Sequence, residues 1–261
     1  MSMYVQHQTG KLIFCPSPPR RIVSLVPSIT ELLYDLGLNE EVVGITKFCI
    51  HPQEWFQTKT RIGGTKTVAL DKIRKLQPDL ILANKEENVK DQVEALAMEF
   101  PVYVSDITSI EDAFEMMLQV GELTGTSQKA VEMVHSLKTG LSLPEQRNIL
   151  NVLYLIWQNP YMAAAGDTFI SNMLQKAGFH NLLEQRQRYP QLTVDEIKEL
   201  HPDVLMLSSE PFPFRQKHAD ELKQLTGINT VILVDGELFS WYGSRMLKSP
   251  SYFSKLRESL F

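Results

Sequence analysis

One thirteen-residue pattern occurs twice in this chain, and this repeat constrains the fold more than any other feature. The first copy, LDKIRKLQPDLIL, covers residues 70–82, and the second, VDEIKELHPDVLM, covers residues 194–206. In each copy, helical spacing ends before a Pro, and a short apolar run follows the next Asp. Such a Pro favours the end of a helix, and a bounded apolar run predicts a buried strand. The repeat therefore predicts two similar α/β lobes.

The segments around the two copies support this interpretation. Both halves open with a strand, a loop, a helix and a glycine, at residues 22–37 and 152–178. Helix–Pro–Asp–strand arrangements also recur in unrelated α/β proteins, but a shared order across several elements favours duplication. Apolar runs alternate with helical spacing, which is typical of a mainly parallel sheet. Strands are expected at 22–26, 42–45, 80–83, 102–104, 152–157, 204–207 and 231–234, and helices at 29–36, 70–76, 88–100, 169–177 and 194–200.

The middle of the chain shows helical periodicity alone, from Ser109 to about Leu141. Gly125 interrupts it, and Ser127 is a suitable cap for a second helix. The sequence thus predicts an N-terminal α/β lobe at 1–107, a helical connector at 108–145 and a C-terminal α/β lobe at 146–261.

Composition excludes several classes of protein. The 261 residues are 43% hydrophobic with a net charge of −5, so no basic surplus exists to bind nucleic acid. The longest apolar run, 149–157, is far shorter than the ~20 residues of a membrane helix. No apolar export segment occupies the first fourteen residues, so a cytosolic chain and one whose signal was removed are both open. Cys15 and Cys49 are expected to be free buried thiols.

Motifs for catalysis are missing from the sequence. Neither a glycine-rich phosphate loop nor a Gly-x-Ser-x-Gly turn occurs, and Gly63-Gly64 alone indicates a turn. A metal site built from His51, His218 and Glu237 remains an alternative. We therefore predict no enzyme, no cofactor and no metal. A sugar-nucleotide transferase is the alternative from another class, although it needs a phosphate-binding loop at a helix N-terminus.

Aromatic residues gather in the loops that follow the predicted strands. Ligands of open α/β sheets bind beyond the carboxyl ends of the strands, and aromatic rings supply large, stiff contact surfaces. Packing of the same rings against the sheet ends is the structural alternative for each of them. These loops are richer in aromatic than in basic residues, and they include Phe48, Trp55, Trp157, Tyr161, Phe212, Phe214, Phe239, Trp241 and Tyr242.

Five segments, taken in order, resemble one family. They are RIVSLVPSITELL at 21–33, GITKFCIHP at 44–52, IGG at 62–64, LQPDLI at 76–81 and DGELFSWYGSR at 235–245. Together they resemble the substrate-binding proteins of cobalamin and ferric-siderophore ABC importers, the class III periplasmic binding proteins with a helical backbone. The resemblance covers nearly the whole chain and is strongest to the cobalamin binders. QTGK at 8–11 is similar to the short hairpin that begins the family domain.

This resemblance implies two Rossmann-like lobes joined by a single rigid backbone helix, with a ligand cleft between the lobes. The ligand it implies is cobalamin or a related corrinoid, with a ferric siderophore or haem as the alternative. Two positions depart from the cobalamin binders, since Lys66 follows the Gly-Gly turn where they can carry Trp, and Trp241 replaces a basic residue. The implied ligand-binding residues are Phe48, Lys66, Trp157, Tyr161, Tyr189, Glu237, Phe239, Trp241, Tyr242 and Arg245.

The same resemblance implies a monomer, periplasmic or otherwise extracytoplasmic, that delivers its metal-chelate ligand to an ABC permease dimer with ATPase subunits. Asp71 and Asp195 occupy the same position of the two repeats, where the family carries acidic residues that dock on the permease. The alternative is that each Asp caps its helix and complements the helix dipole. An interaction protein that has lost its ligand is a third possibility.

Overall fold

The computed structural model describes residues 2–142 and 148–261, so residues 143–147, at the end of the predicted connector and the start of the predicted C-terminal lobe, lie outside it. The chain divides into two compact units. The first unit holds Met1–Ile107, Glu111–Ser136 and Tyr242–Arg245, and the second holds Thr108–Ile110, Leu137–Trp241 and Met246–Phe261. Most of the predicted connector therefore groups with the first unit, and a short segment from near the C-terminus also belongs there.

The first unit contains a five-stranded parallel sheet in the order β5-β4-β3-β6-β7. A separate antiparallel hairpin precedes it, with its turn at the QTGK segment, as the family resemblance implied. The strands are β1 (Ser2–Gln6), β2 (Leu12–Pro16), β3 (Ile22–Ser24), β4 (Val42–Ile45), β5 (Thr60–Arg61), β6 (Leu80–Asn84) and β7 (Val102–Ser105). The helices are α1 (Pro27–Asp35), α2 (Gln53–Thr58), α3 (Leu70–Leu76) and α4 (Lys90–Ala97).

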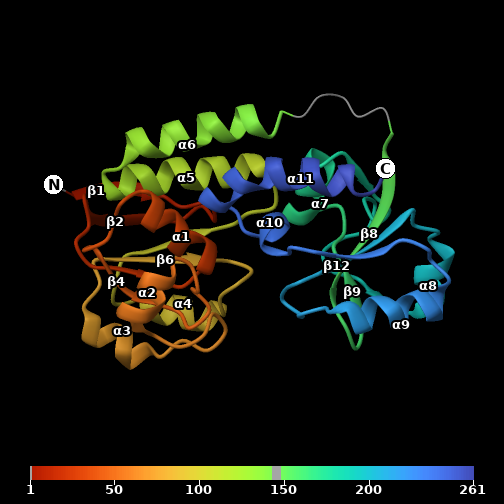
Figure 1. Cartoon of the computed structure of the whole chain (residues 1–261). Coiled ribbons are helices and arrows are strands. Elements are labelled where there is room, and N and C mark those ends of the chain that lie inside the picture. Colours follow the sequence, from red (N-terminus) through yellow and green to blue (C-terminus); the bar gives the residue numbers. More distant parts are fainter. Residues whose placement is uncertain (1, 143–147) are drawn as a thin grey trace. The chain divides into compact units, whose positions relative to one another are not determined.

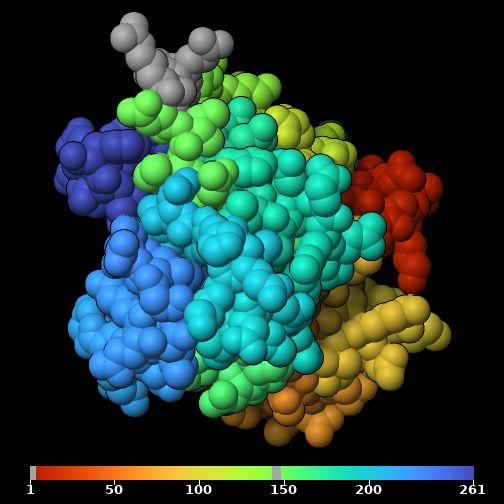
Figure 2. Space-filling view, turned by 90° about the vertical axis from the view of Figure 1, so that its right-hand side faces the viewer, coloured from red at the N-terminus to blue at the C-terminus, as the bar shows by residue number. Residues whose placement is uncertain are grey.

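The second unit contains a mixed sheet in the order β11-β9-β8-β12-β13, and β10 also pairs with β8. Its strands are β8 (Leu150–Trp157), β9 (Tyr161–Ala163), β10 (Phe179–Asn181), β11 (Gln191–Leu192), β12 (Val204–Ser208) and β13 (Val231–Val234). Its helices are α7 (Phe169–Lys176), α8 (Val194–Glu199), α9 (Gln216–Thr226), α10 (Glu237–Ser240) and α11 (Ser249–Glu258). A 3₁₀ turn, Ser244–Lys248, precedes α11. Figure 2 shows one face of this unit, where α8 and α9 lie side by side.

The central helical segment consists of α5 (Ile110–Thr124) and α6 (Ser127–Gly140), which run side by side (Figure 1). The predicted break at Gly125 is confirmed, and its φ of +73° is the left-handed conformation that glycine adopts most readily. Gly121 permits the close packing of the two helices, because a Cβ at this position would lie 2.5 Å from the Cβ of Ala130.

The sequence repeat is confirmed as a structural repeat. Gln77 and His201, which precede the two equivalent prolines, both adopt left-handed φ values, 46° and 45°. Asp79 then accepts a hydrogen bond from the backbone N–H of Arg21 at 2.8 Å, and Asp203 accepts one from Asn151 N–H at 2.7 Å. Each Asp thus joins the repeat to the start of the first strand of its own sheet, and β6 pairs with β3 as β12 pairs with β8.

Both units have their own buried core. Trp55 is fully buried in the first unit and donates its indole N–H to Asn39 Oδ1 at 2.8 Å, so this tryptophan is a core residue. Cys15 and Cys49 are free and buried, as predicted. In the two ranges that the structure describes, no helix has both the length and the apolar character of a membrane span.

Candidate functional site

Phe48 is an accessible predicted contact of the first unit. It follows β4 with 50% of its surface exposed, and its backbone N–H donates to Thr46 Oγ1 at 3.3 Å. Gly64 lies under the ring, since a Cβ there would be 3.1 Å from the Phe48 Cε2 atom. Lys66 is exposed on the loop that follows this glycine pair. The Lys66 ammonium donates a hydrogen bond to the Glu86 carbonyl oxygen, so the Gly-Gly turn supports an outward-facing ring on a loop whose cation is tied to a neighbouring loop.

Trp157 provides the corresponding aromatic surface of the second unit. It is the last residue of β8, is 39% exposed and meets Phe212 edge to face, with ring centroids 5.7 Å apart. Phe212 in turn contacts the rings of Phe214 at 4.8 Å and His218 at 5.3 Å. Rings that are backed in this way stay in place without a ligand, so Trp157 offers a preformed apolar platform.

Two predicted tyrosines lie on the neighbouring antiparallel strands. Tyr161 begins β9, is half-buried and packs against the core cluster of the second unit. Tyr189 is half-buried just before β11, with the exposed Arg188 guanidinium 5.8 Å from its ring centroid. Both residues are thus partly accessible, but only Tyr161 lies at the carboxyl end of β8, whereas Tyr189 lies beside Ala164, level with the middle of that strand.

Trp241 and Glu237 lie in the loop that follows β13, and a carboxylate from another loop holds the tryptophan. Trp241 is 8% exposed and donates its indole N–H to Glu210 Oε1 at 2.8 Å. Ser240 donates its hydroxyl to the same oxygen at 2.5 Å. Glu237 is half-buried at the first turn of α10. Glu210 follows a predicted strand in a loop expected to line the cleft, but it was not assigned to the ligand, because nothing in the sequence relates it to a residue 31 positions away.

Phe239 is a correction to the predicted site. It is fully buried, and its ring lies 4.8 Å from that of Phe253 and 5.3 Å from that of Tyr154. All three rings belong to the core of the second unit, so Phe239 supports the loop rather than presenting a surface to a ligand.

Tyr242 and Arg245 have their polar groups engaged inside the first unit. Tyr242 donates its hydroxyl to Glu87 Oε1 at 3.1 Å. Arg245 binds Glu31 through two hydrogen bonds of 2.6 and 2.9 Å, and the two side chains are 8% and 7% exposed. Burial raises the pKa of Tyr242 well above its usual range. These contacts give both residues a role that the sequence analysis missed, the anchoring of segment 242–245 in the first unit.

Asp71 and Asp195 are both exposed at the second residue of their helices, and neither caps its helix. Asp71 accepts from the Arg74 guanidinium at 3.0 Å with its side chain 89% exposed. In α8 the cap is Thr193, which exchanges hydrogen bonds with Glu196 in a capping box. The capping role expected as the alternative for these aspartates is therefore wrong, whereas their favourable position in the helix dipole remains.

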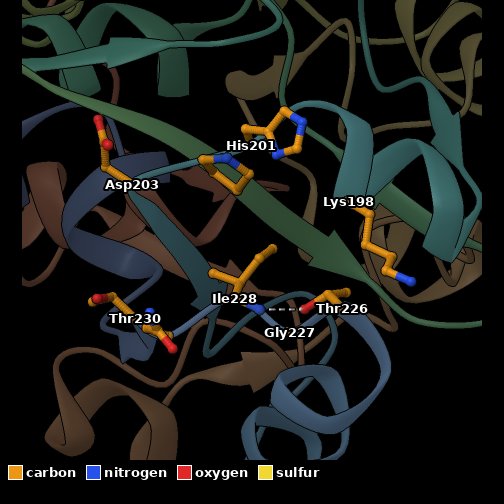
Figure 3. A pocket seen from close by; sticks show the side chains of 9 residues that line it. Lys198, His201, Asp203, Thr226, Gly227, Ile228 and Thr230 are labelled. Atoms are coloured by element: carbon orange, nitrogen blue, oxygen red, sulfur yellow. Dashed lines mark hydrogen bonds between the residues drawn. The ribbon is translucent and has the colours of Figure 1, made fainter.

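A cavity of about 460 Å³ lies in the second unit, away from the predicted ligand contacts (Figure 3). It is lined by the turn from α8 to β12 and the turn from α9 to β13, including Lys198, His201 and Asp203. In the second turn, Ile228 N–H donates to Thr226 Oγ1 at 3.2 Å (Figure 3). The cavity thus lies at the amino ends of β12 and β13, opposite to the carboxyl ends where ligands of such sheets bind.

A metal site built from His51, His218 and Glu237 was an alternative from the sequence. Among residues 2–142 and 148–261, no three His, Cys, Asp or Glu side chains come together as a metal site. His218 instead accepts a hydrogen bond from the Arg215 N–H at 2.9 Å at the start of α9.

Most of the chain is similar in sequence to known proteins. Residues 22–231 match the family model described as periplasmic binding protein. YvrC of Bacillus subtilis (strain 168), an uncharacterized ABC transporter substrate-binding lipoprotein, is 27% identical over 258 residues, which cover 93% of this chain and 80% of that protein. A vitamin B12-binding protein of Vibrio parahaemolyticus is 25% identical over 215 residues, or 79% of this chain and 77% of that protein.

A solved structure shares the fold. A possible iron-binding, periplasmic solute-binding protein from Staphylococcus epidermidis superimposes with a TM-score of 0.78 at 23% identity, covering 94% of this chain and 99% of that chain. The predicted fold class, an α/β protein with two sheets in two lobes, is confirmed by this likeness and by the two sheets described above.

Proposed function

Since this chain belongs to the periplasmic binding protein family, we propose that it captures cobalamin or a related corrinoid for an ABC importer. The chain is an ABC transporter substrate-binding protein and not an enzyme. The alternative of a sugar-nucleotide transferase is therefore wrong. The identity of the ligand is our proposal, and this proposal rests on the chemistry of the accessible loops.

The exposed aromatic platform at Trp157 is the observation that carries the proposal. A half-exposed indole, backed edge to face by Phe212, suits the face of a large flat chelate. In the first unit, Phe48 offers a second accessible ring. Near Trp241 the side chains are acidic rather than basic, with Glu210 and Glu237 in adjoining loops. Such loops favour a ligand without negative groups over an anionic siderophore.

A ferric siderophore or haem is the second candidate. Two exposed cations favour it, because Lys66 and Arg188 stand beside predicted ligand contacts and would pair with anionic groups of a chelate. The solved structure from Staphylococcus epidermidis is itself described as possibly iron-binding.

The proposed partner is an ABC permease, reached through the two equivalent aspartates. Both Asp71 and Asp195 are exposed and free of a capping role, and the Asp71 carboxylate is 89% exposed although one of its oxygens pairs with Arg74, so both can meet arginines of a permease dimer. We also propose that the chain acts as an extracytoplasmic monomer; its location is supported by relatives described as a lipoprotein and as periplasmic.

Absorbance spectra after desalting test the proposal. The protein is incubated separately with cyanocobalamin, haem and a ferric catecholate, and unbound ligand is removed. We expect corrinoid bands to remain at one equivalent per chain. Retention of haem or the ferric catecholate without corrinoid would support the second candidate and contradict the first.

A further inference from the structure

Glu210 occupies a tight junction between two loops of the second unit. It follows β12, and its Oε1 atom receives both the Trp241 indole N–H at 2.8 Å and the Ser240 hydroxyl at 2.5 Å. Gly236 makes this approach possible, since a Cβ there would lie 2.8 Å from the Glu210 Cγ atom. The carboxyl group is therefore held in one orientation from the side of Trp241.

The other carboxyl oxygen, Oε2, has a different environment. No hydrogen bond to Oε2 is made by the residues that the structure describes, although the group is half-buried. Burial raises the pKa of Glu210, and the carboxylates of Glu237 and Asp235 raise it further, against the opposing effect of the bonds from Ser240 and Trp241. Glu210 in turn contributes to raising the pKa of Tyr154, whose hydroxyl donates to Ser208 Oγ at 3.2 Å. An oriented oxygen without a partner is suited to accept a hydrogen bond from a bound molecule.

We propose that Glu210 determines ligand specificity by accepting a hydrogen bond from a ligand N–H group through Oε2 and by repelling ligands that carry carboxylates. This inference rests on the proposed function and deepens it. The peripheral side chains of a corrinoid are amides, which donate N–H groups, whereas those of haem are carboxylates. A carboxylate beside Asp235 and Glu237 would therefore select the corrinoid, because like charges in a partly buried site repel strongly.

The substitution Glu210→Gln tests this role while changing little else. The Gln carbonyl oxygen can still accept from Trp241 and Ser240, but an NH2 group replaces Oε2 and the negative charge is lost. We expect the Kd for cyanocobalamin to rise about tenfold, the effect of one lost hydrogen bond, and the Kd for haem to fall. Glu258→Gln, at an exposed carboxylate of α11, is the matched control and should change neither constant.

A pH profile of the unmodified protein provides a second test that needs no variant. Protonation of Glu210 removes its charge, so the preference for cyanocobalamin over haem should decline as the pH falls through its raised pKa. The preference of Glu210→Gln should stay level over the same range.

Two results would overturn the inference. One is an equal loss of both affinities in Glu210→Gln, which indicates a purely structural role, and the other is a preference in the unmodified protein that does not change with pH. A protein that binds cyanocobalamin but behaves in this way would keep the proposed function and lose only the role of Glu210. A protein that binds neither ligand would contradict the proposed function itself.

Discussion

At the scale of single residues, local sequence pattern predicts the accessible side chains of the candidate site better than the buried ones. Phe48 follows one apolar run by three residues and Trp157 ends another, so their place near strand ends follows from local pattern. Phe239 and Arg245 lie in the same short motif, but their partners Tyr154 and Glu31 are distant in sequence. Burial set by such long-range contacts cannot be predicted from local pattern, which is why Phe239 was assigned to the ligand.

The Arg245–Glu31 pair makes a strong prediction about stability. Replacing one partner of a buried ion pair leaves the other charge without compensation, which typically costs about 3–5 kcal/mol. We expect Arg245→Ala to lower the free energy of unfolding in urea by about this amount. Arg74→Ala removes exposed ion pairs with Asp71 and Glu99 and serves as the control, with an expected loss much smaller than that of Arg245→Ala. Equal losses for the two variants would contradict the anchoring role of Arg245.

Trp157 makes a prediction about affinity. Stacking on an aromatic ring is worth about 1–3 kcal/mol, by analogy with bases on aromatic side chains. Trp157→Ala should therefore raise the Kd for cyanocobalamin about tenfold or more in calorimetry, whereas Trp157→Phe should retain most of the affinity. Unchanged binding by a folded Trp157→Ala protein would remove this residue from the site.

At the scale of elements, segments with a clear apolar pattern were predictable, whereas α9 and the shortest strands were not. The expected ranges 42–45, 70–76 and 231–234 coincide with β4, α3 and β13. Helix α9 was missed because its buried side includes His218 and Thr226, which a hydrophobic pattern does not mark. The two-residue strands β5 and β11 were missed because so short a segment carries no periodicity.

In α8 the cap and the proposed docking residue are different side chains, so helix stability and docking can be tested separately. Thr193→Ala removes a side-chain cap and should cost about 1 kcal/mol in urea unfolding. Asp71→Asn combined with Asp195→Asn should change stability little, since neither residue caps, and should leave the affinity for the ligand unchanged. Transport reconstituted with the cognate permease should nevertheless collapse, because permease arginines would lose their charged partners. Full transport by the double variant would contradict the docking role.

At the scale of the whole molecule, one α/β plan is used twice and then varied at the loops. The equivalent turns at Gln77 and His201 and the equivalent bonds of Asp79 and Asp203 maintain the two sheets. The second unit adds the strands β9 and β11, which pair antiparallel to each other. Tyr161 is the first residue of β9, and Tyr189 lies just before β11. The proposed ligand contacts therefore lie mostly in loops and short strands outside the repeated elements.

Calorimetric titration with cyanocobalamin tests the central claim most directly. The account predicts saturable binding of one corrinoid per chain, with a negative heat-capacity change because apolar surface at the aromatic platform is buried. The absence of a binding signal for cyanocobalamin, in protein that binds haem or a ferric siderophore at one equivalent, would contradict it.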